Sequence, residues 1–192
     1  MITQKAFEDS AALLGVEQAV IKAVAEVESS GDGFLPSGHP KILFEPHVFW
    51  QELLKRNISP GSITGAADIL YKNWQTGKYG KTSAQPERLK RAIAINKDAA
   101  LSSASWGRFQ IMGYNYGLAG FSDVESFVAA MHIDEDQQLI AFVNFVNNKN
   151  LVDELQRKDW AGFAKGYNGS GYKANKYDEK LAAAYQKFKG SL

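Results

Sequence analysis

Apolar residues recur at helical spacing through most of this 192-residue chain, and capping residues divide the pattern into separate helices. Thr3 and Gly15 are typical of the start and end of a helix, and Pro46 suits a first helical position. Residues 41–45 follow a Pro/Gly turn at 36–40 and predict a short strand. The helices are predicted at residues 3–14, 16–29, 46–57, 86–100, 104–112, 123–131, 134–148, 150–157, 159–167 and 174–189. We therefore expect a mainly α (α+β) fold with a small β-hairpin.

The composition is that of a globular domain. Apolar residues make up 45% of the chain, and its length is enough to bury a core without covalent staples. The absence of cysteine excludes disulfides, thiolate metal sites and cysteine nucleophiles. Because no repeat, linker or low-complexity tract is visible, we expect a single domain over residues 1–192.

Neither a targeting segment nor a membrane-spanning run is evident. Glu8 and Asp9 stand where a signal peptide would have its apolar stretch, and no apolar run has spanning length. We therefore expect synthesis in the cytoplasm without a signal peptide or transmembrane segment. The net charge of +1 does not support nucleic-acid binding. Basic residues gather at 78–91 and acidic residues at 123–136, which predicts solvated faces or, alternatively, a basic surface for an anionic polymer.

Glu28 is the strongest candidate for catalysis. At 100° per residue, it falls at the edge of the apolar stripe of the helix at 16–29, beside Val24. Glu26 falls on the opposite flank, where we expect it to form an ion pair with Lys22. Desolvation by apolar neighbours raises the pKa of a carboxyl group, as a general acid working near neutral pH requires. On periodicity alone, a boundary residue without a chemical role is the alternative.

Two later segments carry side chains suited to binding sugars. Trp106 offers a flat face for a sugar ring, and the Gln110 amide can bond to hydroxyl or acetamido groups. Core packing is the alternative for the aromatic residues, and we favour it for Phe109. Tyr167 and Asn168 precede a glycine-rich turn, which would bring a phenol and an amide to the lip of a cleft. The predicted substrate-binding residues are Ser105, Trp106, Gln110, Asn115, Tyr167 and Asn168.

Glu45 is the second catalytic candidate. It follows the predicted strand and precedes the helix at 46–57, so it could face Glu28 across a cleft. Inverting glycosidases hold their two carboxyl groups about 6.5–9.5 Å apart to admit a water, and retaining ones about 5 Å apart. The alternative is an acid that interacts with the helix dipole.

No metal or other cofactor is expected. His39, His47 and His132 could be grouped with Glu45, but no HExxH or comparable spacing is present. No nucleophile elbow, phosphate-binding loop or dinucleotide fingerprint occurs either, which excludes the common nucleophile and nucleotide classes.

Taken together, these motifs resemble the N-acetylmuramidase domain of phage endolysins. More remotely, Glu28 with Ser29, Gly107 to Gln110, and Tyr167 with Asn168 are similar to three signatures of goose-type lysozymes and soluble lytic transglycosylases. The resemblance implies a lysozyme-like fold with the hairpin beside the catalytic helix. It also implies cleavage of the β-1,4 bond between N-acetylmuramic acid and N-acetylglucosamine, with Glu28 as the acid. The segments that carry it are 27–34, 42–47, 103–113 and 166–171.

The resemblance also implies a partner and a place of action. The partner would be the peptidoglycan glycan strand, bound by a monomer. Many members of the family carry a separate wall-binding module, but we expect none here because the 192 residues leave no room for one. The protein would pass from the host cytoplasm to the periplasm and cell wall. Residues 173–192 hold five lysines and could contact anionic lipid or wall polymer as an amphipathic helix, although we favour a packed terminal helix. The competing functions are a lytic transglycosylase and a non-catalytic wall-binding protein.

Overall fold

The structure is a computed structural model that describes residues 1–28, 31–75, 77–78 and 80–190, so Ser29 and Ser30 of the motifs above lie outside it. The strands are β1 (Ile42–Phe44), β2 (Ala104–Trp106) and β3 (Ile111–Met112). The helices are α1 (Gln4–Leu14), α2 (Gln18–Glu28), α3 (Pro46–Lys55), α4 (Gln85–Ile95), α5 (Lys97–Ser102), α6 (Val124–Met131), α7 (Glu135–Asn148), α8 (Val152–Arg157), α9 (Trp160–Asn168) and α10 (Tyr177–Lys189). Short 3-10 turns are η1 (Pro60–Ser62), η2 (Thr82–Ala84), η3 (Gly113–Asn115) and η4 (Ser170–Asn175). The predicted mainly α class is confirmed.

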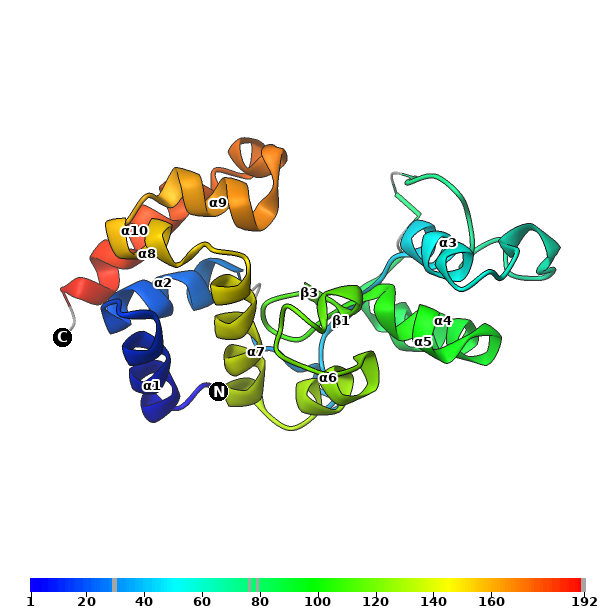
Figure 1. The fold of residues 1–192 in the computed structure, drawn as a ribbon, viewed down its shortest axis with the longest axis horizontal. Coiled ribbons are helices and arrows are strands. Elements are labelled where there is room, and N and C mark those ends of the chain that lie inside the picture. The colour runs from blue at the N-terminus through cyan, green and yellow to red at the C-terminus, as the bar shows by residue number, and fades with distance from the viewer. Residues whose placement is uncertain (29–30, 76, 79, 191–192) are drawn as a thin grey trace.

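The helices form two groups with α7 between them (Figure 1). At one end, α1, α2, α8, α9 and α10 gather, and α10 packs along α2. At the other end, α3 packs on α5 and α5 on α4. The sheet and α6 lie between α7 and this second group, so the sheet joins the two ends of the molecule.

Helix α1 begins and ends at the predicted capping residues. The Thr3 side chain accepts a hydrogen bond from the backbone of Ala6, and Gly15 ends α1 in the left-handed conformation, with φ of 63°. The helix predicted at 86–100 is divided, because Asn96 is extended and its side chain caps α5. The result is two short helices, α4 and α5.

The prediction of a helix at 104–112 is wrong, because this segment forms β2 and β3. β2 pairs antiparallel with β3 and, on its other edge, with β1, where Ile42 lies opposite Trp106. The predicted hairpin is therefore a three-stranded sheet whose middle strand comes from a distant part of the chain. Phe34, before the predicted turn, and Pro40, the last residue of that turn, form only an isolated bridge.

The β2–β3 turn depends on two left-handed residues and on one buried amide. Gly107 has φ of 69° and Gln110 has φ of 49°. A Cβ added at Gly107 would lie 2.6 Å from the side chain of Gln138. The Gln138 amide is 1% exposed, accepts a hydrogen bond from the Arg108 backbone at 2.7 Å, and donates one to Met131 at 3.0 Å. The turn is thus held directly against α7.

The loop that follows α2 is attached to the same turn of α7. The backbone N–H of Gly33 donates to Glu135, which is 2% exposed, and Arg108 contacts both carboxylate oxygens of Glu135 at 3.2 Å. Burial alone would raise the pKa of Glu135, but these hydrogen bonds and the guanidinium charge outweigh it and lower the pKa. The group is therefore a buried, partnered carboxylate.

The C-terminal helix is packed, as favoured from the sequence. Leu181, Ala184 and Tyr185 on α10 are buried, so the apolar face that would lie on a membrane is part of the core. Glu26 pairs with Lys187 of α10 at 2.6 Å and not with Lys22 as expected. No helix within the part of the chain that the structure describes has the length and apolarity to cross a membrane.

Replacing Gly107 with Ala should lower the free energy of unfolding by about 2–4 kcal/mol, because the left-handed conformation and the contact with Gln138 both oppose a Cβ. Gly117→Ala is the matched control, since a Cβ there meets nothing within 4 Å. Urea denaturation monitored by circular dichroism measures both variants. Equal stabilities would contradict the role assigned to this turn.

Candidate active site

Glu28 is the last residue of α2 and lines a cleft of about 530 Å³. The end of α2, the β2–β3 turn with η3, the C-terminal end of α7, and the junction between α9 and α10 supply its walls. Of the predicted site residues, Glu28, Gln110, Asn115, Tyr167 and Asn168 line this cleft together. Further lining residues were not predicted from the sequence and include Ile111, Met112, Tyr114, Phe145, Lys149 and Tyr177.

The carboxyl group of Glu28 is half-buried and holds its proton unusually well. Burial raises its pKa from an ordinary value of 4.5 to about 7, although a hydrogen bond from Asn168 lowers it in part. The Asn168 amide donates to Oε1 of Glu28 at 3.0 Å. Because this bond occupies a lone pair of Oε1, the proton is favoured on Oε2. Below pH 7 the cleft therefore contains a neutral carboxylic acid that can donate its proton.

Aromatic side chains form the wall beside this acid. The Tyr167 hydroxyl donates to the carbonyl oxygen of Phe109 at 2.9 Å, and its ring stacks on Phe163 with centroids 5.6 Å apart. Burial raises the pKa of Tyr167 well above its ordinary value. Tyr167 is therefore a fixed part of the cleft wall. Phe109 is 3% exposed and stacks on Phe142 at 4.5 Å, so it packs in the core as favoured.

Tyr177, at the start of α10, brings a second phenol to the cleft. Burial raises its pKa, and the charge of Glu28 raises it further, which indicates that the two groups lie within electrostatic range. No local signal in the sequence marks this residue, because α10 begins immediately after η4 and reaches the cleft only through its packing on α2 and α9.

Ser105 and Trp106, which were also predicted to bind substrate, are not among the residues that line this cleft. Trp106 is 3% exposed, and its indole nitrogen donates to Leu101 at 3.1 Å. Ser105 is 5% exposed, and its hydroxyl donates to Gln110 at 2.8 Å. Both residues lie on β2, the middle strand of the sheet, where they are covered.

Gln110 and Asn115 do reach the cleft. The Gln110 side chain is exposed and donates to the carbonyl of Gly107 at 2.8 Å, so the amide also closes the β2–β3 turn. Gln110 lines a second cavity of about 360 Å³ as well, together with Lys41 and Arg108. Gln110 is thus the residue that the linings of both cavities share.

Glu45 lies beside the cleft and is not one of its lining residues. It occupies the N-cap of α3 without a side-chain capping bond, and Nδ1 of His47 is 3.4 Å from its carboxylate. Tyr114 lines the cleft, and its pKa is raised first by burial and also by the charge of Glu45. The charge of Glu45 therefore reaches Tyr114 in the cleft wall.

The histidines are divided between two places. His39 and His132 meet edge to face with centroids 6.2 Å apart, while His47 lies with Glu45. Within the described ranges, no three His, Asp or Glu side chains are grouped closely enough to hold a metal ion.

The comparison with known families identifies the chain. The sequence model of the N-acetylmuramidase family matches residues 17–189. The chain belongs to this family. Among solved structures, it is similar to the crystal structure of the Burkholderia AP3 phage endolysin, with 39% sequence identity and a TM-score of 0.89 over 98% of this chain and 71% of that one. No relative was found among curated proteins. The muramidase resemblance predicted from the motifs is thus confirmed, and so is the fold class.

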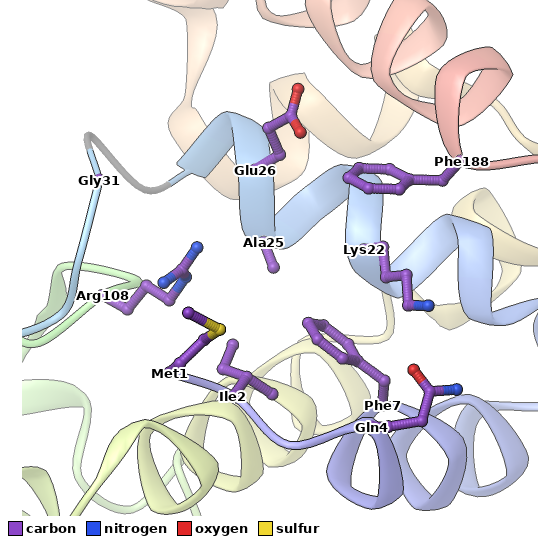
Figure 2. Close-up of a pocket in the computed structure, with 10 residues that line it drawn as sticks. All are labelled: Met1, Ile2, Gln4, Phe7, Lys22, Ala25, Glu26, Gly31, Arg108 and Phe188. Atoms are coloured by element: carbon purple, nitrogen blue, oxygen red, sulfur yellow. The ribbon is translucent and has the colours of Figure 1, made fainter. Parts of the chain in front are cut away.

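The muramidase also has a cavity of about 640 Å³ on another side of α2 (Figure 2). Phe7 of α1 and Phe188 of α10 flank it, and Arg108 reaches it from the β2–β3 turn. Its lining carboxylate, Glu26, is exposed and paired with Lys187. Because Glu26 is exposed and paired with a cation, it lacks the burial that suits Glu28 to donate a proton.

The raised pKa of Glu28 should make the stability of this muramidase depend on pH. Between pH 4.5 and 7 the unfolded chain releases this proton while the folded protein retains it, so rising pH favours unfolding. Glu28→Gln removes that term, and the variant should gain about 3 kcal/mol in free energy of unfolding relative to the wild type between pH 4 and pH 8. Urea denaturation at both values measures the difference. A constant difference would mean that the carboxyl group is not desolvated.

Proposed function

We propose that this muramidase hydrolyses the β-1,4 bond between N-acetylmuramic acid and N-acetylglucosamine in peptidoglycan, with Glu28 as the general acid. The observation that carries the proposal is a carboxyl group with a pKa of about 7 in an open cleft. It is the only carboxylate among the described residues that line this cleft. Membership of the N-acetylmuramidase family supports the choice of bond.

In the proposed mechanism, Oε2 of Glu28 gives its proton to the glycosidic oxygen as the bond to the sugar breaks. The carboxyl group becomes a carboxylate in this step. The Asn168 amide already donates to Oε1, so its hydrogen bond strengthens as negative charge develops. Asn168 therefore stabilises the product of proton transfer more than the starting acid, while burial by the surrounding apolar side chains keeps the acid protonated beforehand.

The second half of the reaction needs a water that attacks the sugar. We propose Glu45 as the base that orients this water, since its charge reaches Tyr114 in the cleft wall even though its carboxylate does not line the cleft. Its partly buried side chain lies 3.4 Å from Nδ1 of His47. The similarity to a phage endolysin supports a role in degrading the bacterial wall after release from the host cytoplasm.

Glu28→Gln should reduce the hydrolysis of purified sacculi by at least about 100-fold, because the amide cannot donate the proton. Wild-type activity should fall as pH rises through about 7, where Glu28 loses its proton. Glu26→Gln is the matched control, since it changes an exposed carboxylate on the same helix and should retain activity. Loss of turbidity measures all three proteins. A Glu28→Gln variant with more than a few per cent of wild-type activity would contradict the assignment.

The products separate hydrolysis from its alternatives. Hydrolysis adds one water to each pair of released ends, and mass spectrometry of the muropeptides detects it directly. Anhydro products would mean that the muramic acid's own hydroxyl attacks. Binding to sacculi without solubilisation would mean that the chain is not an enzyme for this substrate.

Glu45→Gln should lower kcat by about 10- to 100-fold if its carboxylate orients the water. The alkaline limb of the pH profile should stay near pH 7, because that limb belongs to Glu28. Initial rates from pH 4 to pH 9 measure both features. An unchanged kcat would assign the base to another group.

A further inference from the structure

The cleft of Glu28 also contains a cation that the proposed reaction does not use. Lys149 follows the last residue of α7, is exposed, and lines the cleft. Its ammonium group lies 5.3 Å from the ring centroid of Phe145, and that ring meets Tyr167 edge-on at 5.7 Å. The cation is therefore held beside the wall of the proposed site.

The charge of the lining is unbalanced in the pH range where Glu28 is protonated. Among the described residues that line the cleft, Lys149 is the only Lys or Arg, and Glu28 is the only carboxylate. Below pH 7 Glu28 is neutral, so Lys149 gives the lining a net charge of +1. Arg108, in the adjoining cavity, differs because it is paired with Glu135.

The hydroxyl and acetamido groups of a glycan are neutral and do not require a cation. Muramic acid differs from N-acetylglucosamine by a lactyl ether, which ends in a carboxylate or continues as a peptide that carries carboxylates. We infer that Lys149 binds a carboxylate on the muramic acid side of the substrate and thereby selects muramic-acid-containing strands over uncharged ones. This inference rests on the proposed function.

Lys149 has a second role that any test must separate from binding. A cation at the C-terminal end of a helix interacts favourably with the helix dipole, so Lys149→Met could lower stability without a role in recognition. Lys149→Arg keeps the charge and should preserve both roles. Lys90→Met is the matched control, because Lys90 is exposed on α4 and does not line the cleft.

The test measures the binding of soluble peptide-bearing glycan oligomers by calorimetry in the Glu28→Gln background, so that binding is observed even if no bond is cut. Lys149→Met should raise Kd about three- to tenfold, and Lys149→Arg and Lys90→Met should change it less than about twofold. Amidation of the oligomer carboxylates should raise Kd by the same factor for the protein that retains Lys149. It should have no effect on the Lys149→Met variant, because the two changes remove one interaction.

Amidase-stripped oligomers identify the source of the carboxylate, since they retain only the lactyl group. An effect of Lys149→Met that persists on them assigns the lactyl carboxylate, and an effect confined to intact oligomers assigns the peptide. If amidation changes Kd equally for the protein that retains Lys149 and for the Lys149→Met variant, the inference is overturned. This holds even if the two proteins differ in melting temperature. Failure of the proposed function gives a different result, because the wild type would then leave intact oligomers uncleaved.

Discussion

Two buried side chains on the first turn of α7 hold the segments that form the proposed site. Glu135 accepts hydrogen bonds from Gly33, in the loop after α2, and from Arg108, in the β2–β3 turn. Gln138 accepts from the backbone of Arg108. A buried carboxylate that loses its partners costs several kcal/mol, so both segments are strongly held to α7. The chain leaving Glu28 and the turn that carries Gln110 are thus fixed to one element.

The environment of Glu28 favours proton donation but lowers the stability of the folded protein. Its pKa of about 7 means that the folded protein resists ionisation of a group that is ionised in the unfolded chain at neutral pH. Asn168 reduces this penalty through its hydrogen bond, but burial is the larger effect. A stronger donor at this position would stabilise the carboxylate and weaken the acid. A neutral amide therefore balances the two requirements.

Features that depend on the local spacing of residues could be predicted from the sequence. Features that depend on contacts between distant segments could not. Capping by Thr3 and the position of Glu28 at the edge of an apolar stripe follow from residues within a few turns. The burial of Trp106 could not be predicted, because its strand is defined by pairing with Ile42, more than sixty residues earlier. Lys149 was missed for a related reason, since nothing near it in the sequence indicates that the end of α7 meets the ends of α2 and α9.

The meeting of these helix ends has an electrostatic consequence. Glu28, Asn168 and Lys149 lie at the C-terminal ends of α2, α9 and α7, where the helix dipoles direct negative potential into one cleft. That potential disfavours an ionised carboxyl group, so it acts on Glu28 in the same direction as burial. It would also repel the carboxylates of an anionic glycan. Lys149 offsets the repulsion at the wall without a direct ion pair to the acid, because Glu28 is neutral below pH 7.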